Sequence, residues 1–219
     1  MSTISEDGPD VHHVAVDEAQ QIEAREPLGA AGDPTMLGLP TFILGSIALG
    51  LALTGYLPAA AAAATLPIII MSTGLRQFVA ALWAIKLGQS AAACIFGVFS
   101  GFWLSYALLL LGLGHGWYGI KTGDVQATVS AFLLTWCIGV GALTGVTLRL
   151  PLAFTVLFAL VDLALALVLL GNERTSTALT HAGGYVVLLF AALGVYLFAG
   201  AASAATGGKP FGLGKPIVS

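Results

Sequence analysis

The stretch that decides the fold of this chain runs from Gly74 to Tyr106 and reads GLRQFVAALWAIKLGQSAAACIFGVFSGFWLSY. Two hydrophobic limbs meet at residues 86–89, which predicts the second half of one membrane helix, a tight turn and a second helix. Arg76 and Gln77 lie well inside the first limb, where hydrocarbon makes an unpaired polar group costly. We therefore expect both side chains to have polar partners or a path that water can reach.

The composition around this stretch is that of a membrane protein. The chain has 219 residues, of which 58% are hydrophobic and 9% are charged, and its mean hydropathy is +0.94. A soluble domain of this size needs more polar surface, so the sequence predicts an all-α integral membrane protein. Eight of the 11 acidic residues precede residue 34, and the basic residues are scattered, so no nucleic-acid partner is expected.

Six apolar segments follow the acidic N-terminal region, each close to the length of about 20 residues that crosses a bilayer. We place them at residues 36–57, 62–85, 89–113, 126–148, 151–171 and 177–203. This predicts a flexible acidic tail over residues 1–32, a six-helix transmembrane domain over 33–206 and a C-terminal tail over 207–219. Five Lys and Arg residues fall on the side of the termini and two on the other, which predicts that both termini lie in the cytoplasm. We expect the protein in the inner (plasma) membrane of the cell.

Polar residues inside the predicted spans are the candidates for function. The sequence contains no catalytic constellation, phosphate-binding loop or metal-ligand spacing, so we expect no enzymatic activity, metal or cofactor. Arg76 lies roughly 15 Å of helix from the end of its span, and Asp162 lies near the centre of the fifth. Opposite charges at matching depth predict a pair, with either a structural role or a role as a proton relay. Gln77 either links helices or contacts a passing solute.

Three phenylalanines fall on alternate spans: Phe42 on the first, Phe99 on the third and Phe154 on the fifth. A pore ringed by bulky apolar side chains excludes hydrated ions and gates by dewetting. Spacing alone fits ordinary packing equally well.

Several short motifs follow one another along residues 33–217. They are Asp33-Pro-Thr-Met-Leu-Gly-Leu39, Gly74 with Gln77, Gly88-Gln-Ser90, Phe102-Trp-Leu104 and His181-Ala-Gly-Gly-Tyr185. They resemble the motifs of the acetate uptake transporter family, which comprises bacterial succinate/acetate permeases and fungal ammonia/acetate exporters. The resemblance implies six-helix protomers in a homo-hexamer within the lipid bilayer, each protomer with its own solute path.

The resemblance also implies roles for individual residues. The family constriction takes one bulky residue from each of helices one, three and five, here Phe42, Phe99 and Phe154. The substrate pathway would pass Asp33, Pro34, Leu37, Gly38 and Leu39, with Gln77 as a polar contact. We expect a channel or proton-coupled transporter for acetate or a similar short monocarboxylate, succinate included.

Two departures from the family motifs keep other functions open. Asp33 stands where the family has Asn, and Ala84 where it has Glu. A carboxylate at Asp33 repels an anionic substrate unless it is paired or protonated. The first alternative is therefore a channel for ammonia, ammonium or a neutral solute such as urea, and the second is a non-transporting structural subunit. If transport is coupled to protons, Asp162 and Asp33 are the candidate carriers.

Overall fold

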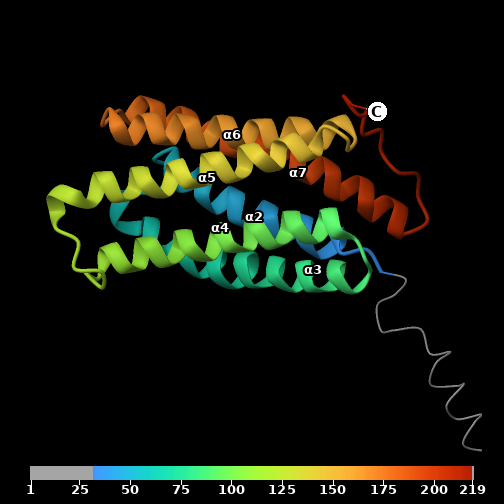
Figure 1. Ribbon diagram of the computed structural model, residues 1–219, viewed down its shortest axis with the longest axis horizontal. Helices are drawn as coiled ribbons and strands as arrows, with labels where there is room; N and C mark the ends of the chain where they lie inside the picture. The colour runs from blue at the N-terminus through green and yellow to red at the C-terminus, as the bar shows by residue number, and fades with distance from the viewer. Residues whose placement is uncertain (1–31, 219) are drawn as a thin grey trace, which may run out of the picture. The chain divides into compact units, whose positions relative to one another are not determined.

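The computed structural model describes residues 32–218, and Figure 1 shows their long helices running side by side. Six segments of this described part are long and apolar enough to cross a membrane, which confirms the predicted all-α architecture. The long helices are α2 (Thr35–Leu53), α3 (Leu75–Lys86), α4 (Ser90–Gly114), α5 (Val125–Thr147), α6 (Leu152–Glu173) and α7 (Thr177–Ala205). Apart from Gly32, the tail predicted over residues 1–32 lies outside the described residues.

The helix ends agree with the prediction to within two residues, except at the end of the first span and at the start of the second, which begins three residues early at Ala59. The first span was predicted to reach residue 57, but α2 ends at Leu53. Gly55 follows with a φ of +74°, a left-handed conformation that glycine adopts without a steric penalty and that commonly terminates helices. The segment after Gly55 therefore turns away from the axis of α2.

The second span is a composite of three helical forms rather than the uniform helix predicted over 62–85. It begins with the 3-10 segment η1 (Ala59–Thr65), continues as the π-helical segment η2 (Ile68–Gly74) and ends as α3. Pro58 and Pro67 immediately precede the first two segments and cannot donate a backbone hydrogen bond. The Ser100 hydroxyl on α4 donates to the Gly74 carbonyl at 2.8 Å, so the neighbouring helix satisfies part of this irregular backbone.

Most consecutive helices pack as neighbours, and the first and last long helices lie against each other, whereas α4 and α5 make little contact. The helix α2 lies against α7 and the second span, α6 lies between α5 and α7, and α3 runs along α4. A further 3-10 turn, η3 (Thr122–Asp124), precedes α5. Residues 207–218 return to the α5–α6 turn, where the Ala153 N–H donates to the Leu213 carbonyl and the Ile217 N–H donates to the Leu148 carbonyl.

Close backbone approach at Gly184 fixes the crossing of α7 over the end of α2. A Cβ atom at this position would lie 2.7 Å from the Thr54 backbone nitrogen, which cannot swing aside as a side chain could. We predict that Gly184→Ala lowers the free energy of unfolding by about 1–3 kcal/mol, because overpacking forces the two backbones apart. Thermal unfolding in detergent measures the effect.

Gly139→Ala is the matched control for this substitution. Gly139 also lies inside a membrane helix, but a Cβ atom there would meet nothing within 4 Å. We expect its melting temperature to equal that of the unmodified protein. Equal stability of both variants would show that the α2–α7 crossing tolerates a methyl group.

Candidate functional site

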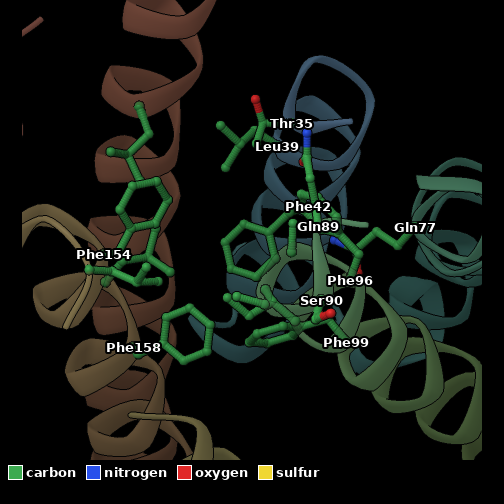
Figure 2. A pocket seen from close by; sticks show the side chains of 16 residues that line it. Thr35, Leu39, Phe42, Gln77, Gln89, Ser90, Phe96, Phe99, Phe154 and Phe158 are labelled. Atoms are coloured by element: carbon green, nitrogen blue, oxygen red, sulfur yellow. The ribbon is translucent and has the colours of Figure 1, made fainter. Parts of the chain in front are cut away.

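A cavity of about 380 Å³, here called the first cavity, lies toward the end of the protein where α2, α4 and α6 begin. Figure 2 shows its walls, with the rings of Phe154 and Phe158 on α6 facing those of Phe42 and Phe99. Polar side chains reach the lining only as neutral groups, from Thr35, Gln77, Gln89 and Ser90. The first cavity is therefore largely apolar and carries no charged side chain in its lining.

A second cavity, of about 170 Å³, continues beyond the rings of Phe42 and Phe99, which line both spaces. Of the residues that line it, only Trp103 and Tyr106 carry a polar side-chain atom, and none is charged. A solute here would be surrounded almost entirely by hydrocarbon and aromatic rings.

The rings of Phe42 and Phe99 make the wall between the first and second cavities, here called the aromatic wall, and Phe158 packs on Phe99 from the side of the first cavity. The ring centroids of Phe42 and Phe99 are 5.2 Å apart with an interplanar angle of 77°, and those of Phe99 and Phe158 are 5.5 Å apart at 74°. Edge-to-face packing of this kind is the favoured geometry for aromatic pairs, so the wall is stable without polar contacts. The rings of Phe42 and Phe99 thus lie between the two cavities.

A polar vestibule lies at the opposite end of the protein. It has a volume of about 650 Å³ and shares Leu53 with the second cavity. Its lining includes Gln126, Asn172 and His181 together with several threonines. The first cavity, the aromatic wall, the second cavity, Leu53 and the vestibule thus follow one another through the protein.

Gln77 is the polar residue most deeply placed in the first cavity. Its side chain is 1% exposed, and its Oε1 has no hydrogen-bond partner among the described residues. Figure 2 shows the side chain reaching from α3 toward the phenylalanine rings. An unsatisfied buried polar group costs about 1–3 kcal/mol, so the Gln77 oxygen is a candidate acceptor for a hydrogen-bond donor in the cavity.

The turn that opens α2 has both structural and lining residues. Asp33 is exposed, and its two carboxylate oxygens accept hydrogen bonds from the Thr35 N–H at 2.9 Å and the Thr35 hydroxyl at 2.6 Å. The carboxylate therefore has local partners at the positive end of the helix. Thr35 and Leu39 line the first cavity.

The other predicted residues of this turn have packing roles. Pro34 is fully buried. A side chain at Gly38 would collide with the ring of Phe96, and Leu37 packs beside that ring. These contacts hold the start of α2 against α4.

The structure does not bring Arg76 and Asp162 together. Arg76 is exposed on α3, whereas Asp162 lies on α6, on the other side of the helices in Figure 1. The Thr144 hydroxyl on α5 donates to Asp162 Oδ2 at 2.6 Å, and Oδ1 has no partner in the described part of the chain. No ion pair involving Arg76 occurs within residues 32–218.

Of the residues predicted for the site, the first cavity assembles Leu39, Phe42, Gln77, Phe99 and Phe154. Sequence reasoning missed Phe158, whose ring meets Phe99 directly. Its position one helical turn after Phe154, on the same face of α6, was the available signal. Across the described ranges, no cluster of His, Cys, Asp and Glu could hold a metal ion.

Comparisons with known proteins agree with this architecture. The solved structure of the bacterial acetate channel SatP superposes with a TM-score of 0.74 at 24% identity, covering 84% of this chain and 99% of that one. At this identity the likeness shows a shared fold.

Curated fungal proteins are similar to the chain in sequence. Accumulation of dyads protein 2 of Saccharomyces cerevisiae is 28% identical over 82% of this chain and 65% of its own length. Ammonia transport outward protein 2 of the same yeast is 27% identical (79% and 62%), and acetate permease A of Emericella nidulans is 28% identical (80% and 59%). The chain thus spans less than two thirds of the length of these relatives.

The sequence profile of the GPR1/FUN34/yaaH family matches residues 18–208, which is most of the chain. This match confirms the resemblance first seen in the motifs from Asp33 to Tyr185. The chain therefore belongs to the GPR1/FUN34/yaaH family.

Proposed function

We propose that this protein conducts acetate or a similar short monocarboxylic acid across the membrane, and that the solute crosses the aromatic wall in its neutral, protonated form. The observation that carries the proposal is the pair of cavities on either side of Phe42 and Phe99, neither with a charged lining residue. The relatives named as an acetate channel and an acetate permease support the choice of solute.

The electrostatic balance favours the neutral acid. Moving a bare carboxylate into a site without a counter-charge costs several kcal/mol even after the protein relaxes, and of order 20 kcal/mol in the idealised limit. Protonating a carboxylic acid with a pKa of about 4–5 at neutral pH costs only about 3–4 kcal/mol. Since the Gln77 amide can donate one hydrogen bond and accept another, it suits a protonated carboxyl group. A dicarboxylate such as succinate would need a second proton.

In this proposal the solute carries its own proton, so no protein carboxylate has to titrate during transport. The Asp33 carboxylate accepts two hydrogen bonds from Thr35 at the start of α2, and Asp162 lines neither cavity. Because Asp33 lies outside both linings, and a neutral acid carries no charge for it to repel, this carboxylate does not oppose passage of the acid.

Ammonia is the second candidate solute. The second cavity is walled by six Phe and Trp rings, from Phe42, Phe99, Phe102, Trp103, Phe132 and Phe190. Aromatic faces attract ammonium, and the absence of charges from this lining also suits neutral ammonia. One yeast relative is named for outward ammonia transport.

We further propose a homo-oligomer, a hexamer by resemblance, with both termini in the cytoplasm. The helix α5 is the least buried of the six membrane segments, and Gly141 and Gly145 on it face open space. Exposed small residues of this kind allow close helix contacts, here with another protomer. The uneven count of Lys and Arg on the two sides supports the orientation.

Uptake of labelled acetate into proteoliposomes tests the function, with protein-free vesicles as the baseline. We expect Gln77→Leu, which keeps the size of the side chain and removes its polar atoms, to lower uptake about tenfold, the effect of one lost hydrogen bond. Gln89→Leu is the control, because Gln89 also lines the cavity but is exposed. Uptake of ammonia alone would favour the second candidate, and no uptake of either by folded protein would favour a structural role.

A further inference from the structure

Two charged side chains lie near the middle of their membrane segments without a partner of opposite charge. Arg76 lies ten residues before the end of α3 at Lys86, and Asp162 lies ten residues after the start of α6 at Leu152. Both of these helix ends lie at the same end of the protein, so each charge is about 15 Å of helix away from that end. Neither residue forms an ion pair within residues 32–218.

An unpaired Arg76 at this depth is costly. Its side chain is exposed on α3, beside the exposed apolar side chains of Leu75 and Val79. The hydrocarbon core is about 30 Å thick, so a residue about 15 Å from its edge lies close to the midplane. Charged residues at such depth almost always pair or face the interior of a protein. Since the described part of its own chain supplies no counter-charge, the counter-charge has to come from another molecule.

Asp162 carries the matching negative charge on an accessible side of α6. The Thr144 hydroxyl on α5 donates to Oδ2 at 2.6 Å, which leaves the charge uncompensated. Oδ1 is enclosed, whereas the residue as a whole is partly exposed, so its exposed surface lies on the Cβ and Oδ2 side. A carboxylate oxygen accepts more than one hydrogen bond, so Oδ2 can also receive a guanidinium N–H. Gly141 lies one turn before Thr144 on α5, and a Cβ atom there would meet nothing within 4 Å, so an arginine has room to approach.

The two charges lie on different sides of the protomer, which decides the kind of contact that can join them. The helix α3 packs on α2 and α4, whereas α6 packs on α5 and α7, and Figure 1 shows α3 and α6 apart. A two-fold contact presents the same surface on both copies, whereas a head-to-tail contact joins two different surfaces. Protomers related by an axis along the membrane normal keep each residue at the same depth. Arg76 of one copy is then level with Asp162 of the partner subunit.

We propose that the Arg76 guanidinium forms an ion pair with Asp162 of the partner subunit, in a head-to-tail contact between the α3 face of one protomer and the α5–α6 face of the next. This inference rests on the proposed homo-oligomer and specifies which two surfaces meet in it. An isolated protomer carries both charges uncompensated in hydrocarbon, and each contact neutralises one of each sign. The pair therefore favours assembly and disfavours contacts between like surfaces, which would oppose two charges of the same sign.

Exchange of the two charges tests the pair. We expect Arg76→Asp and Asp162→Arg, each alone, to raise the protein concentration at which the oligomer is half dissociated about hundredfold, since each places like charges opposite each other in a dry contact. The double variant restores the attraction and should return to the value of the unmodified protein. Lys86→Glu, which reverses an exposed charge at the end of α3, should change nothing. Light scattering of detergent-solubilised protein over a dilution series measures the dissociation.

Cross-linking locates the contact with both charges in place. Val79 and Ala159 are exposed on α3 and α6, and each lies seven residues from the same end of the protein. Two differently tagged chains, one with Val79→Cys and one with Ala159→Cys, are reconstituted together in a background in which Cys94 and Cys137 are replaced by Ala. A bifunctional thiol reagent should join the two tags, whereas chains that all carry Val79→Cys should not be joined.

Two results would overturn the inference while leaving a homo-oligomer in place. One is a folded double variant that dissociates as readily as the single variants, and the other is cross-linking only between chains that all carry Val79→Cys. Should the charge variants fail to fold, the cross-link decides the question alone. Unmodified protein that stays monomeric at every concentration would overturn the homo-oligomer as well. Acetate uptake is measured separately in proteoliposomes, so its absence would refute transport and leave the contact standing.

Discussion

At a fixed total acetate concentration, the initial rate of uptake is expected to fall about tenfold for each pH unit above the pKa of the acid, which is about 4–5. The reason is that only the neutral acid passes the uncharged cavities, and its fraction falls tenfold per unit in this range. Proteoliposomes with equal internal and external pH, assayed between about pH 5 and 8, measure the dependence. Rates replotted against the concentration of neutral acid should fall on one curve.

Two variants that lack a carboxylate distinguish a proton carried by the solute from a proton carried by the protein. Asp33→Asn and Asp162→Asn remove the carboxylates that sequence reasoning named as carriers. Because neither side chain lines the cavities, we expect both variants to keep the same pH slope. A weaker dependence of the uptake rate on pH in either variant would show that a protein carboxylate carries the proton. An uptake rate that follows the total acetate concentration at every pH would show passage of the anion.

Removing the aromatic wall is expected to give the largest change among substitutions. In the double variant Phe42→Ala with Phe99→Ala, the first and second cavities merge, since these are the two residues that line both. A continuous, wider space should raise acetate uptake by at least about tenfold and admit bulkier acids such as benzoate, because the constriction sets the size limit. Stability should fall by about 3–5 kcal/mol for each truncated ring.

Phe78→Ala is the control for this experiment, because Phe78 is 52% exposed on α3 and lines neither cavity. Competition between labelled acetate and benzoate in the same vesicles measures the size limit. Phe158→Ala should produce part of the effect, because its ring supports Phe99, and Phe154→Ala should produce less. Unchanged rates and unchanged exclusion of benzoate in the folded double variant would place the gate elsewhere.

Hydropathy and length were sufficient to predict the spans, because each helix must cover the same hydrocarbon thickness. They were insufficient in the second span, where Pro58 and Pro67 alter the backbone hydrogen bonding without changing the average hydropathy. The early end of α2 depends on one left-handed residue, Gly55, which an apolar window does not detect.

The site could be predicted where the depth of a residue in the membrane was informative. It could not be predicted where the direction of a side chain around its helix was needed. Arg76 and Gln77 are adjacent in sequence, yet Arg76 is exposed and Gln77 is buried, with 1% of its surface accessible. The reason is that successive residues of a helix point in different directions. Residue type alone favours the membrane interface for a tryptophan, whereas the structure buries Trp103 beside the second cavity. Their similar depth in the membrane suggested that Arg76 pairs with Asp162. The two residues lie on α3 and α6, and these helices do not pack against each other there.

The most direct test of passage as a neutral acid follows labelled acetate and luminal pH together in proteoliposomes held at a chosen membrane potential by potassium and valinomycin. Passage of the neutral acid predicts that the lumen acidifies in step with acetate accumulation and that potentials of either sign leave the rate unchanged. Uptake that responds to the potential without acidifying the lumen would contradict this mechanism and show that the protein conducts the acetate anion.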